Sequence, residues 1–474
     1  MQIHSRQGVQ LLLSFVLTVA PILAGVEARA NDAEKRFGEE VLEILRDEGT
    51  IGDERYEELR ELERAEHEAA KRSASVDPEA FSVTYENALN FNRNDGQVKI
   101  KLGGRLQADF TSIQPDSELS SALDLTSPVP YSPIGGDGEG VELRRTRLYV
   151  SGDLYDRVVF KTQFDFAGGD VSLKDQYLGI KNIPHVGTIL VGHLKEPFSL
   201  EQLTSSKNLT FAERSLSTVF DPGRNFGVLF KNHYLGKRLT TAAGIFAVTS
   251  GDVEFFSREE DFDLSGRVTG LPYLDQEKKR FVHLGYSVVH RFADMGEAGF
   301  SSRPEIHQAE KYLDTGNFAT DGATVIAAEL ALVTGPFSVQ SEWKNGWFDN
   351  RDGENWQANS VYVEASYFLT GESRNYKTTS GSFGRVTPNR PFGLGKGGWG
   401  AFQIAARYSW IDLQDEGMNG GEERNITAAL SWYLFSDLRL LFNYVYADVA
   451  DTGDLLSNVS SEIHAFQVRA QIEF

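Results

Sequence analysis

The most constraining feature of this chain is a strict alternation of apolar and polar residues, which is clearest at its C-terminal end. One face of this segment carries His464, Phe466, Val468, Ala470, Ile472 and Phe474, and the other carries Ala465, Gln467, Arg469, Gln471 and Glu473. Successive side chains of a β-strand point to opposite sides. Over about ten positions, this pattern is what lipid outside and water inside require of a barrel wall. The edge strand of a soluble sandwich alternates in the same way, so the rest of the chain must decide between the two.

The same alternation starts abruptly at Val98 and recurs through the remainder of the chain. Each predicted strand is separated from the next by polar or glycine-containing residues. The predicted strands are 98–110, Val141–Gly152, Arg157–Phe166, Leu173–Ile180, Gly187–Lys195, Phe226–His233, Leu239–Val248, Phe262–Gly270, Phe281–His290, Ala323–Leu332, Phe337–Trp347, Ser360–Leu369, Phe402–Ile411, Asn425–Leu434, Leu438–Tyr446 and Ile463–Phe474.

The lengths of the connections predict how these sixteen strands are arranged. Tight links such as residues 153–156 and 335–336 take turns with long polar stretches such as residues 111–140 and 196–225. Short turns on one rim and long loops on the other are typical of bacterial outer-membrane barrels. The sequence therefore predicts an all-β fold, a 16-stranded antiparallel transmembrane β-barrel, which is wide enough for a water-filled channel.

The N-terminal part of the chain has a different character. Arg6 precedes an apolar run over residues 9–23, and Ala28-Arg29-Ala30 follows as a small-x-small cleavage pattern, which together indicate a secretory signal peptide. Helical spacing of apolar residues then predicts two short helices. They form either a solvated spacer with partial helicity or a periplasmic hairpin for oligomerisation or for contact with the cell wall. The predicted organisation is a signal peptide at 1–30, a helical segment at 31–73, a linker at 74–96 and the barrel at 97–474.

Composition narrows the location and the chemistry of the chain. Cysteine is absent, which excludes disulfides and cysteine nucleophiles. The net charge of -21 argues against a nucleic-acid-binding protein, whose footprint would be basic. An even number of strands returns the chain to the side from which it started. We therefore expect the barrel to lie in the outer membrane of a Gram-negative-type envelope, with the N-terminal segment in the periplasm.

Several segments of the predicted barrel carry a family resemblance. They are Lys101-Leu102-Gly103-Gly104-Arg105-Leu106-Gln107-Ala108-Asp109-Phe110, Leu143-Arg144-Arg145-Thr146-Arg147-Leu148, Thr204-Ser205-Ser206-Lys207, Ala212-Glu213-Arg214, Leu369-Thr370-Gly371-Glu372 and Ser431-Trp432-Tyr433. With these segments, residues 97–474 resemble the phosphate-selective porins of the O and P family. The resemblance implies a homotrimer of sixteen-stranded barrels, whose third long loop folds inward and presents cationic side chains to a passing anion.

Candidate anion-binding residues follow from this resemblance, position by position. It implies roles for Arg105 on the first strand, for Arg144 and Arg145 on the second, for Asp175, and for Lys207 and Arg214 in the inward-folding loop. Where the family narrows its pore with aromatic residues, this chain carries Arg147 and Lys195. Arginine suits this task, because its planar donors match phosphate oxygens in pairs.

The strand pattern leaves the orientation of one candidate open. If Leu148 faces lipid, then Arg145 and Arg147 face the lumen, and Arg144 points outward on a regular strand. Either the strand bulges at Arg144, or this residue lies above the bilayer. Lys161 is also lumenal by the pattern. It either contacts passing anions, or it only hydrates the lumen or pairs with an acidic residue across it.

We therefore predict a channel for passive diffusion of small anions, phosphate or polyphosphate-like, that needs no cofactor and no metal. A general diffusion porin of low selectivity is the alternative within transport, because the acidic run 254–263 and the few basic residues at 302–307 depart from the family pattern. An envelope-tethering structural protein is a further alternative. An enzyme is disfavoured, since the nine histidines fall singly and no nucleophile elbow or HExxH-type motif is present.

Overall fold

The computed structural model describes residues 43, 46, 52–62, 77–116, 138–248, 261–393, 397–453 and 460–474, and the chain divides into two compact units at residue 80. The signal peptide predicted at 1–30 lies outside the described residues, as does much of the predicted helical segment. In the first unit, residues 53–62 form a helix. Its buried Tyr56 packs against Arg46, whose guanidinium carbon lies 4.6 Å from the ring centroid.

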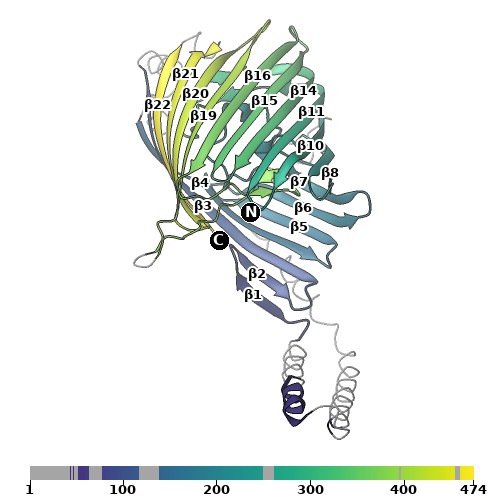
Figure 1. The fold of residues 1–474 in the computed structure, drawn as a ribbon. Coiled ribbons are helices and arrows are strands. Elements are labelled where there is room, and N and C mark those ends of the chain that lie inside the picture. Colours follow the sequence, from purple (N-terminus) through teal and green to yellow (C-terminus); the bar gives the residue numbers. More distant parts are fainter. Residues whose placement is uncertain are drawn as a thin grey trace, which may run out of the picture. The chain divides into compact units, whose positions relative to one another are not determined.

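The second unit is a closed antiparallel barrel, with neighbouring strands side by side and steeply tilted (Figure 1). Its sixteen strands are β3 (Val98–Pro115), β4 (Gly138–Leu154), β5 (Val158–Asp165), β6 (Ser172–Ile183), β7 (Gly187–Lys195), β8 (Arg224–Tyr234), β9 (Leu239–Ala247), β10 (Phe262–Asp275), β11 (Arg280–Ala298), β14 (Phe318–Thr334), β15 (Phe337–Asn350), β16 (Trp356–Phe368), β19 (Ala401–Asp415), β20 (Met418–Tyr433), β21 (Leu438–Asp451) and β22 (Ser461–Glu473). Each coincides with a predicted strand, and the fold class is confirmed.

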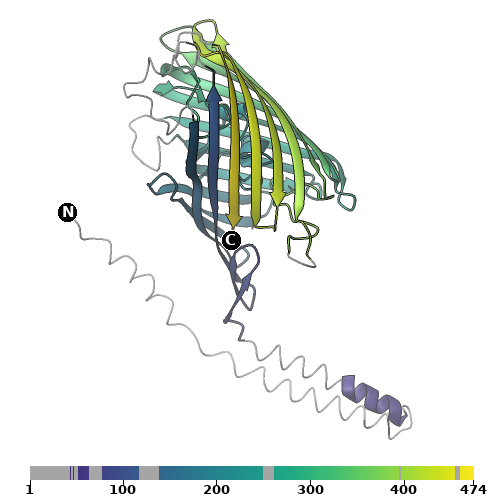
Figure 2. The same ribbon diagram turned by 90° about the vertical axis from the view of Figure 1, so that its left-hand side faces the viewer.

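The barrel closes where its last strand meets its first. Strand β22 pairs with β3 from Ile463 opposite Pro115 to Glu473 opposite Arg105. Figure 2 shows the yellow C-terminal strand beside the dark blue first strand. Closure pairs the backbone donors and acceptors of both strands. Each unpaired backbone group would otherwise cost several kcal/mol in lipid.

The predicted alternation is borne out in the barrel wall. On β3, Leu106 and Phe110 are 36% and 41% exposed on the outer face, whereas Gln107 and Asp109 are 0% and 1% exposed on the inner face. Apolar residues outside and polar residues inside are the arrangement that a lipid-embedded, water-filled barrel requires. No helix within the described residues is both long and apolar enough to cross a bilayer.

A short hairpin precedes the barrel within the predicted linker. Strand β1 (Phe81–Tyr85) pairs with β2 (Leu89–Arg93), and β2 pairs with Lys99–Leu102 at the start of β3. The hairpin therefore extends the sheet beyond the point at which β22 stops pairing. The pattern of residues 74–96 predicted a linker without strands.

Two long connections enter the lumen from opposite rims. Residues 196–223 link β7 to β8 on the long-loop rim, and residues 369–400 link β16 to β19 on the short-turn rim. The second connection contains β17 (Tyr376–Lys377) and β18 (Ser382–Phe383), and it departs from the expected pattern of tight turns on that rim. The backbone N–H of Phe383 donates to the Thr204 hydroxyl at 3.3 Å, so the two segments meet inside the barrel.

Apolar residues hold the 196–223 segment inside the barrel. It contains the short helix α5 (Leu200–Leu203), which is capped by the Ser199 hydroxyl, and the 3-10 turn η1 (Leu216–Phe220). Phe198 and the residues of η1 pack into a core with the wall of β14 to β22 and with the 299–317 segment, which carries β12 (Ser301–Ser302) and β13 (Leu313–Asp314). The inserted segments thus lie against one half of the barrel.

Candidate functional site

Lumenal arginines of the filled half hold the backbone of the 196–223 segment. Arg439 of β21 donates to the carbonyls of Leu209 and Thr210 at 2.8 and 3.0 Å. Arg407 of β19 donates to the Glu213 carbonyl at 3.2 Å, and Arg469 of β22 donates to the Ala212 carbonyl. These arginines position the loop, and the sequence analysis did not single them out.

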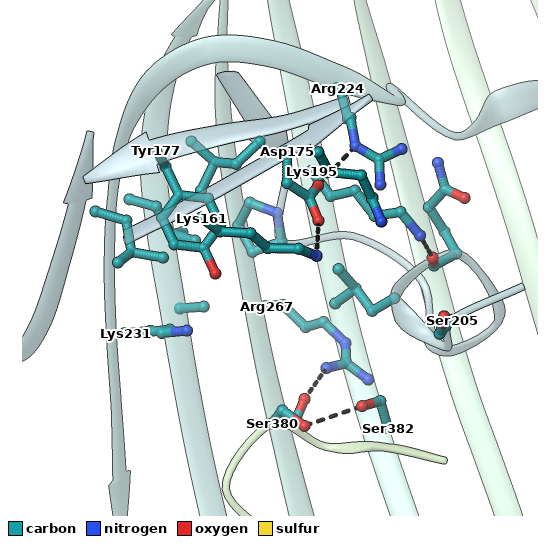
Figure 3. Close-up of a pocket in the computed structure, with 18 of the residues that line it drawn as sticks. Lys161, Asp175, Tyr177, Lys195, Ser205, Arg224, Lys231, Arg267, Ser380 and Ser382 are labelled. Carbon is teal, nitrogen blue, oxygen red and sulfur yellow. Dashed lines mark hydrogen bonds and ion pairs between the residues drawn. The ribbon is translucent and has the colours of Figure 1, made fainter. Parts of the chain in front are cut away.

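The open half of the lumen contains a cavity of about 450 Å³ between β3 to β10 and the tips of the two inserted segments (Figure 3). Among its lining residues are nine cationic side chains and the carboxylate of Asp175. The cationic lining residues are Arg105, Arg145, Arg147, Lys161, Lys195, Arg214, Arg224, Lys231 and Arg267. The cavity therefore gathers positive charge from six wall strands and from one inserted loop.

Strand β4 contains the bulge that the sequence analysis left as one of two possibilities. Gln107 of β3 pairs with Arg145, whereas the next residue, Ala108, pairs with Leu143, so Arg144 has no register partner on β3. The extra residue bends the strand and reorients its side chain. As a result, Arg144 and Arg145 both contact the inward-folded Glu213, at 2.9 and 3.4 Å.

Glu213 is the carboxylate on which three arginines converge. Besides Arg144 and Arg145, Arg469 also contacts it, at 2.5 Å. Burial alone would raise the pKa of the Glu213 carboxyl, but the three arginines hold this pKa well below its usual value. Glu213 is therefore ionised and compensates part of the arginine charge at this point of the lumen.

Other cations of the cavity are paired with acidic residues of the wall. Arg147 donates to Asp165 at 2.6 Å, and Asp175 lies between Arg224, at 2.7 Å, and Lys161. Figure 3 shows Lys161 and Arg224 approaching Asp175 from two sides. Lys161 pairs with an acidic residue, as the structural alternative predicted, and it also lines the cavity.

Four cations of the cavity make no ion pair with a carboxylate among the described residues. Arg105 donates to the hydroxyls of Ser206 and Ser205, at 2.7 and 3.4 Å. Lys195 donates to a backbone carbonyl, and Arg214 donates to three backbone carbonyls at 3.0 to 3.4 Å. Lys231 lines the same cavity and is exposed. Neutral oxygens orient Arg105, Lys195 and Arg214 without cancelling their charge.

The structure brings most of the sequence-predicted residues together. Arg105, Arg145, Arg147, Asp175, Lys195 and Arg214 line the 450 Å³ cavity. Arg144 lines a neighbouring cavity of about 360 Å³, which shares Arg145 and Arg214 with the first. Lys207 lies apart from both, beside Glu473 at 2.7 Å. Lys161, Arg224, Lys231 and Arg267 were not predicted as site residues, although the inward phase of their strands could have identified them.

A metal centre is not apparent in the described part of the chain, where no group of three or more His, Asp or Glu side chains is placed to hold an ion. The carboxylates of the cavity are instead engaged by arginine and lysine. The cations that face the cavity can make reversible contact with an anion. A closed sixteen-stranded barrel with a partly filled, cation-lined lumen defines the class of outer-membrane channels.

Comparison with known proteins specifies the class further. A family model described as phosphate-selective porin O and P matches residues 130–474. The chain belongs to this family. It is thus an outer-membrane porin from an anion-selective family, a channel rather than an enzyme.

Individual relatives are distant. Porin O of Pseudomonas aeruginosa is 23% identical over 79% of this chain and 89% of its own length. An uncharacterized protein of Caulobacter vibrioides is 28% identical over 77% of this chain and 71% of its own length. Among solved structures, the anion-selective porin of Comamonas acidovorans is 12% identical with a TM-score of 0.48, and the match covers 80% of this chain and 100% of that chain.

Proposed function

We propose that this porin is a passive diffusion channel for small oxyanions, phosphate or polyphosphate-like, and that cations along the 450 Å³ cavity select for them. The observation that supports this best is the set of cations that have no carboxylate partner among the described residues, Arg105, Lys195, Arg214 and Lys231. Positive charge in a narrow, partly dehydrated passage lowers the barrier for anions and raises it for cations. The net charge of -21 does not oppose this, because charges farther away than about 8 to 10 Å are screened.

The geometry favours anions that carry more charge than chloride. Arg105 and Arg214 present planar donor groups that can bind two oxygens of one phosphate. Arg147 and Lys195 occupy positions at which the resemblance implies aromatic residues, and they add charge to the same cavity. The proposed solutes therefore include phosphate anions larger than orthophosphate, such as pyrophosphate. Conduction requires that each contact is weak enough to release the anion.

Neutralising single arginines of the cavity tests this proposal. We expect Arg145→Ala and Arg214→Ala each to lower the anion-over-cation permeability ratio about two- to fivefold, because each removes one positive charge from the passage. The measurement is the zero-current potential in planar bilayers under a KCl gradient. Lys237→Ala, in the exposed turn between β8 and β9, removes the same charge outside the lumen and is the matched control. Unchanged potentials in both arginine variants would reject the proposed site.

Low selectivity is the second candidate, and one observation favours it. Five of the nine cavity cations, namely Arg145, Arg147, Lys161, Arg224 and Arg267, are already paired with carboxylates. If these pairs dominate the electrostatic potential of the passage, anions and cations experience similar barriers. A zero-current potential near zero for the unmodified channel would support a general diffusion porin.

We further propose that the barrel functions as a homotrimer. Strands β5, β7 and β9 have 8, 9 and 9 residues. At about 3.3 Å per residue and a tilt of about 40°, they span roughly 20 to 23 Å, less than an apolar band of about 25 Å. Thr162 and Gln176 also put hydrogen-bonded polar groups on the outer face of β5 and β6. Contact with neighbouring copies would cover this low, partly polar wall.

Native mass measurement in mild detergent tests the assembly. We expect a particle of three chains, because the low wall formed by β5 to β9 is poorly matched to lipid on its own. On a gel, we also expect the unheated sample to migrate more slowly than the heated monomer. A purified, conducting channel with the mass of one chain would contradict the trimer.

The N-terminal segment is proposed to lie in the periplasm, where residues 31–73 contact peptidoglycan or a periplasmic partner. This is consistent with the hairpin β1–β2, which joins the short-turn end of β3. Deletion of residues 31–73 separates tethering from transport. An envelope-integrity defect with unchanged conductance would support a tether, and unchanged envelope integrity would count against it.

A further inference from the structure

The inner wall of β7 to β9 carries a group of apolar residues, here called the lumenal apolar patch. It consists of Leu190 and Leu194 on β7, Leu229 on β8 and Phe246 on β9, with exposures of 3%, 4%, 7% and 1%. Inward-facing positions of a water-filled barrel are normally polar. Neighbouring side chains already bury most of this patch, and the exposed edges of Leu190, Leu194 and Leu229 face the cavity.

The other apolar clusters inside this barrel are covered by the inserted segments. Leu216 and Ile306 cover the largest cluster, Leu200 and Phe383 belong to the second, and Val386 contributes to the fourth. The lumenal apolar patch differs from all of them. Among the described residues, its members and the side chains packed against them come only from β5, β6, β7, β8 and β9. No inserted segment of the described chain contributes a residue to this cluster.

The patch borders the cation-lined cavity. Leu190, Leu194 and Leu229 are among the residues that line it, together with Tyr177. Lys161 is the register partner of Tyr177, and Lys231, Lys195 and Arg224 border the same space (Figure 3). A volume of about 450 Å³ falls in the range that accommodates a small organic molecule. Positive charge and apolar surface thus face one solute-sized space.

We propose that the pore takes organic anions with an apolar body, such as aryl or short alkyl esters of phosphate. The anionic head contacts the cations of the cavity, and the apolar body lies on the lumenal apolar patch. Inorganic phosphate uses the first contact only. This inference rests on the proposed function, because the anionic head of the solute contacts the same cations. It adds a solute class whose apolar body fits the leucines of the lumenal apolar patch.

Comparing two phosphate monoesters tests the role of the apolar body. Phenyl phosphate and methyl phosphate carry the same head, and each is added to the native channel conducting KCl in a planar bilayer. We expect phenyl phosphate to block half of the current at an about tenfold lower concentration, the effect of burying about 60 Å² of apolar surface. Benzyl alcohol, which has the ring without the charge, should not block at comparable concentrations.

Substitutions of Leu229 test whether the lumenal apolar patch causes the stronger block by phenyl phosphate. Leu229→Asn should bring the blocking concentrations of the two esters close together and leave that of methyl phosphate unchanged. Leu229→Met retains an apolar side chain and should retain the difference. Both variants must show the unheated gel mobility of the native barrel. If Leu229→Asn fails to fold, the comparison of the two esters on the native channel still decides.

The outcomes separate this inference from the proposed function. Equal block by both esters in a channel that still prefers anions would overturn the organic-anion proposal and leave the proposed function intact. Equal block by benzyl alcohol and phenyl phosphate would overturn the role of the cations in holding the head. A native channel that shows no preference for anions over cations would overturn the proposed function.

Discussion

Replacing Lys195 by glutamate is expected to lower the anion-over-cation permeability ratio about tenfold, because two unit charges change at one point of the passage. Lys195 ends β7 and reaches into the 450 Å³ cavity, where its described hydrogen-bond partner is the Gln202 carbonyl. No carboxylate of the described chain compensates it. The added glutamate would face Arg214 and Arg224, so part of the remaining positive charge would also be neutralised.

The zero-current potential under a KCl gradient measures this change. Lys237→Glu introduces the same two-charge change in the exposed β8–β9 turn and is the matched control. We expect it to leave the potential close to that of the native channel, since salt screens exposed charges beyond about 8 to 10 Å. An equal effect of both variants would mean that the general field of the protein, and not the cavity, determines selectivity.

Arg267→Met is expected to destabilise the barrel by about 3 to 5 kcal/mol and to raise its conductance. Arg267 binds both carboxylate oxygens of Glu329 at 2.8 and 2.7 Å, and the two side chains are 4% and 0% exposed. Removing the arginine leaves the buried Glu329 carboxylate with the His283 ring, at 3.1 Å, in place of its two-pronged cationic partner. Arg267 also donates to the carbonyls of Ser380 and Gly381 at 3.3 and 2.8 Å, so the variant releases the tip of the 369–400 segment into a wider passage.

Unfolding in denaturant and single-channel conductance report the two effects separately. Arg424→Met is the control, because Arg424 pairs with Glu422 at 2.6 Å while remaining 46% exposed. Such surface pairs contribute about 1 kcal/mol or less. A stability loss in Arg267→Met no larger than in the control, with unchanged conductance, would show that Arg267 does not anchor the inserted segment.

The barrel could be predicted from the sequence because its physical cause is local. Lipid and water contact alternate residues of a strand, so the positions of Leu106 and Gln107 are enough to assign them to the outer and the inner face of the barrel wall. The hairpin β1–β2 was not predicted, although Phe81, Val83 and Tyr85 also alternate with polar residues. Five residues are too few for a period to stand out from its polar surroundings.

The interior was less predictable, because a strand pattern fixes the face of a side chain and not its partner. Arg105, Arg439 and Arg469 are all lumenal by the pattern, yet Arg439 and Arg469 hold the backbone of the inserted loop, and Arg105 lines the cavity. The inward course of residues 374–386 has no local signal, since a polar, glycine-containing stretch is equally compatible with an external loop. Their positions depend on contacts between residues far apart in the sequence.

The zero-current potential of the native channel in planar bilayers under a KCl gradient is the most direct measurement of whether lumenal cations govern permeation. The sign of the potential should show that chloride is more permeant than potassium. Added phosphate or pyrophosphate should reduce the chloride current at lower concentrations than a monovalent anion of similar size needs for the same reduction. A potential with the sign of potassium movement, with no effect of phosphate, would contradict the account.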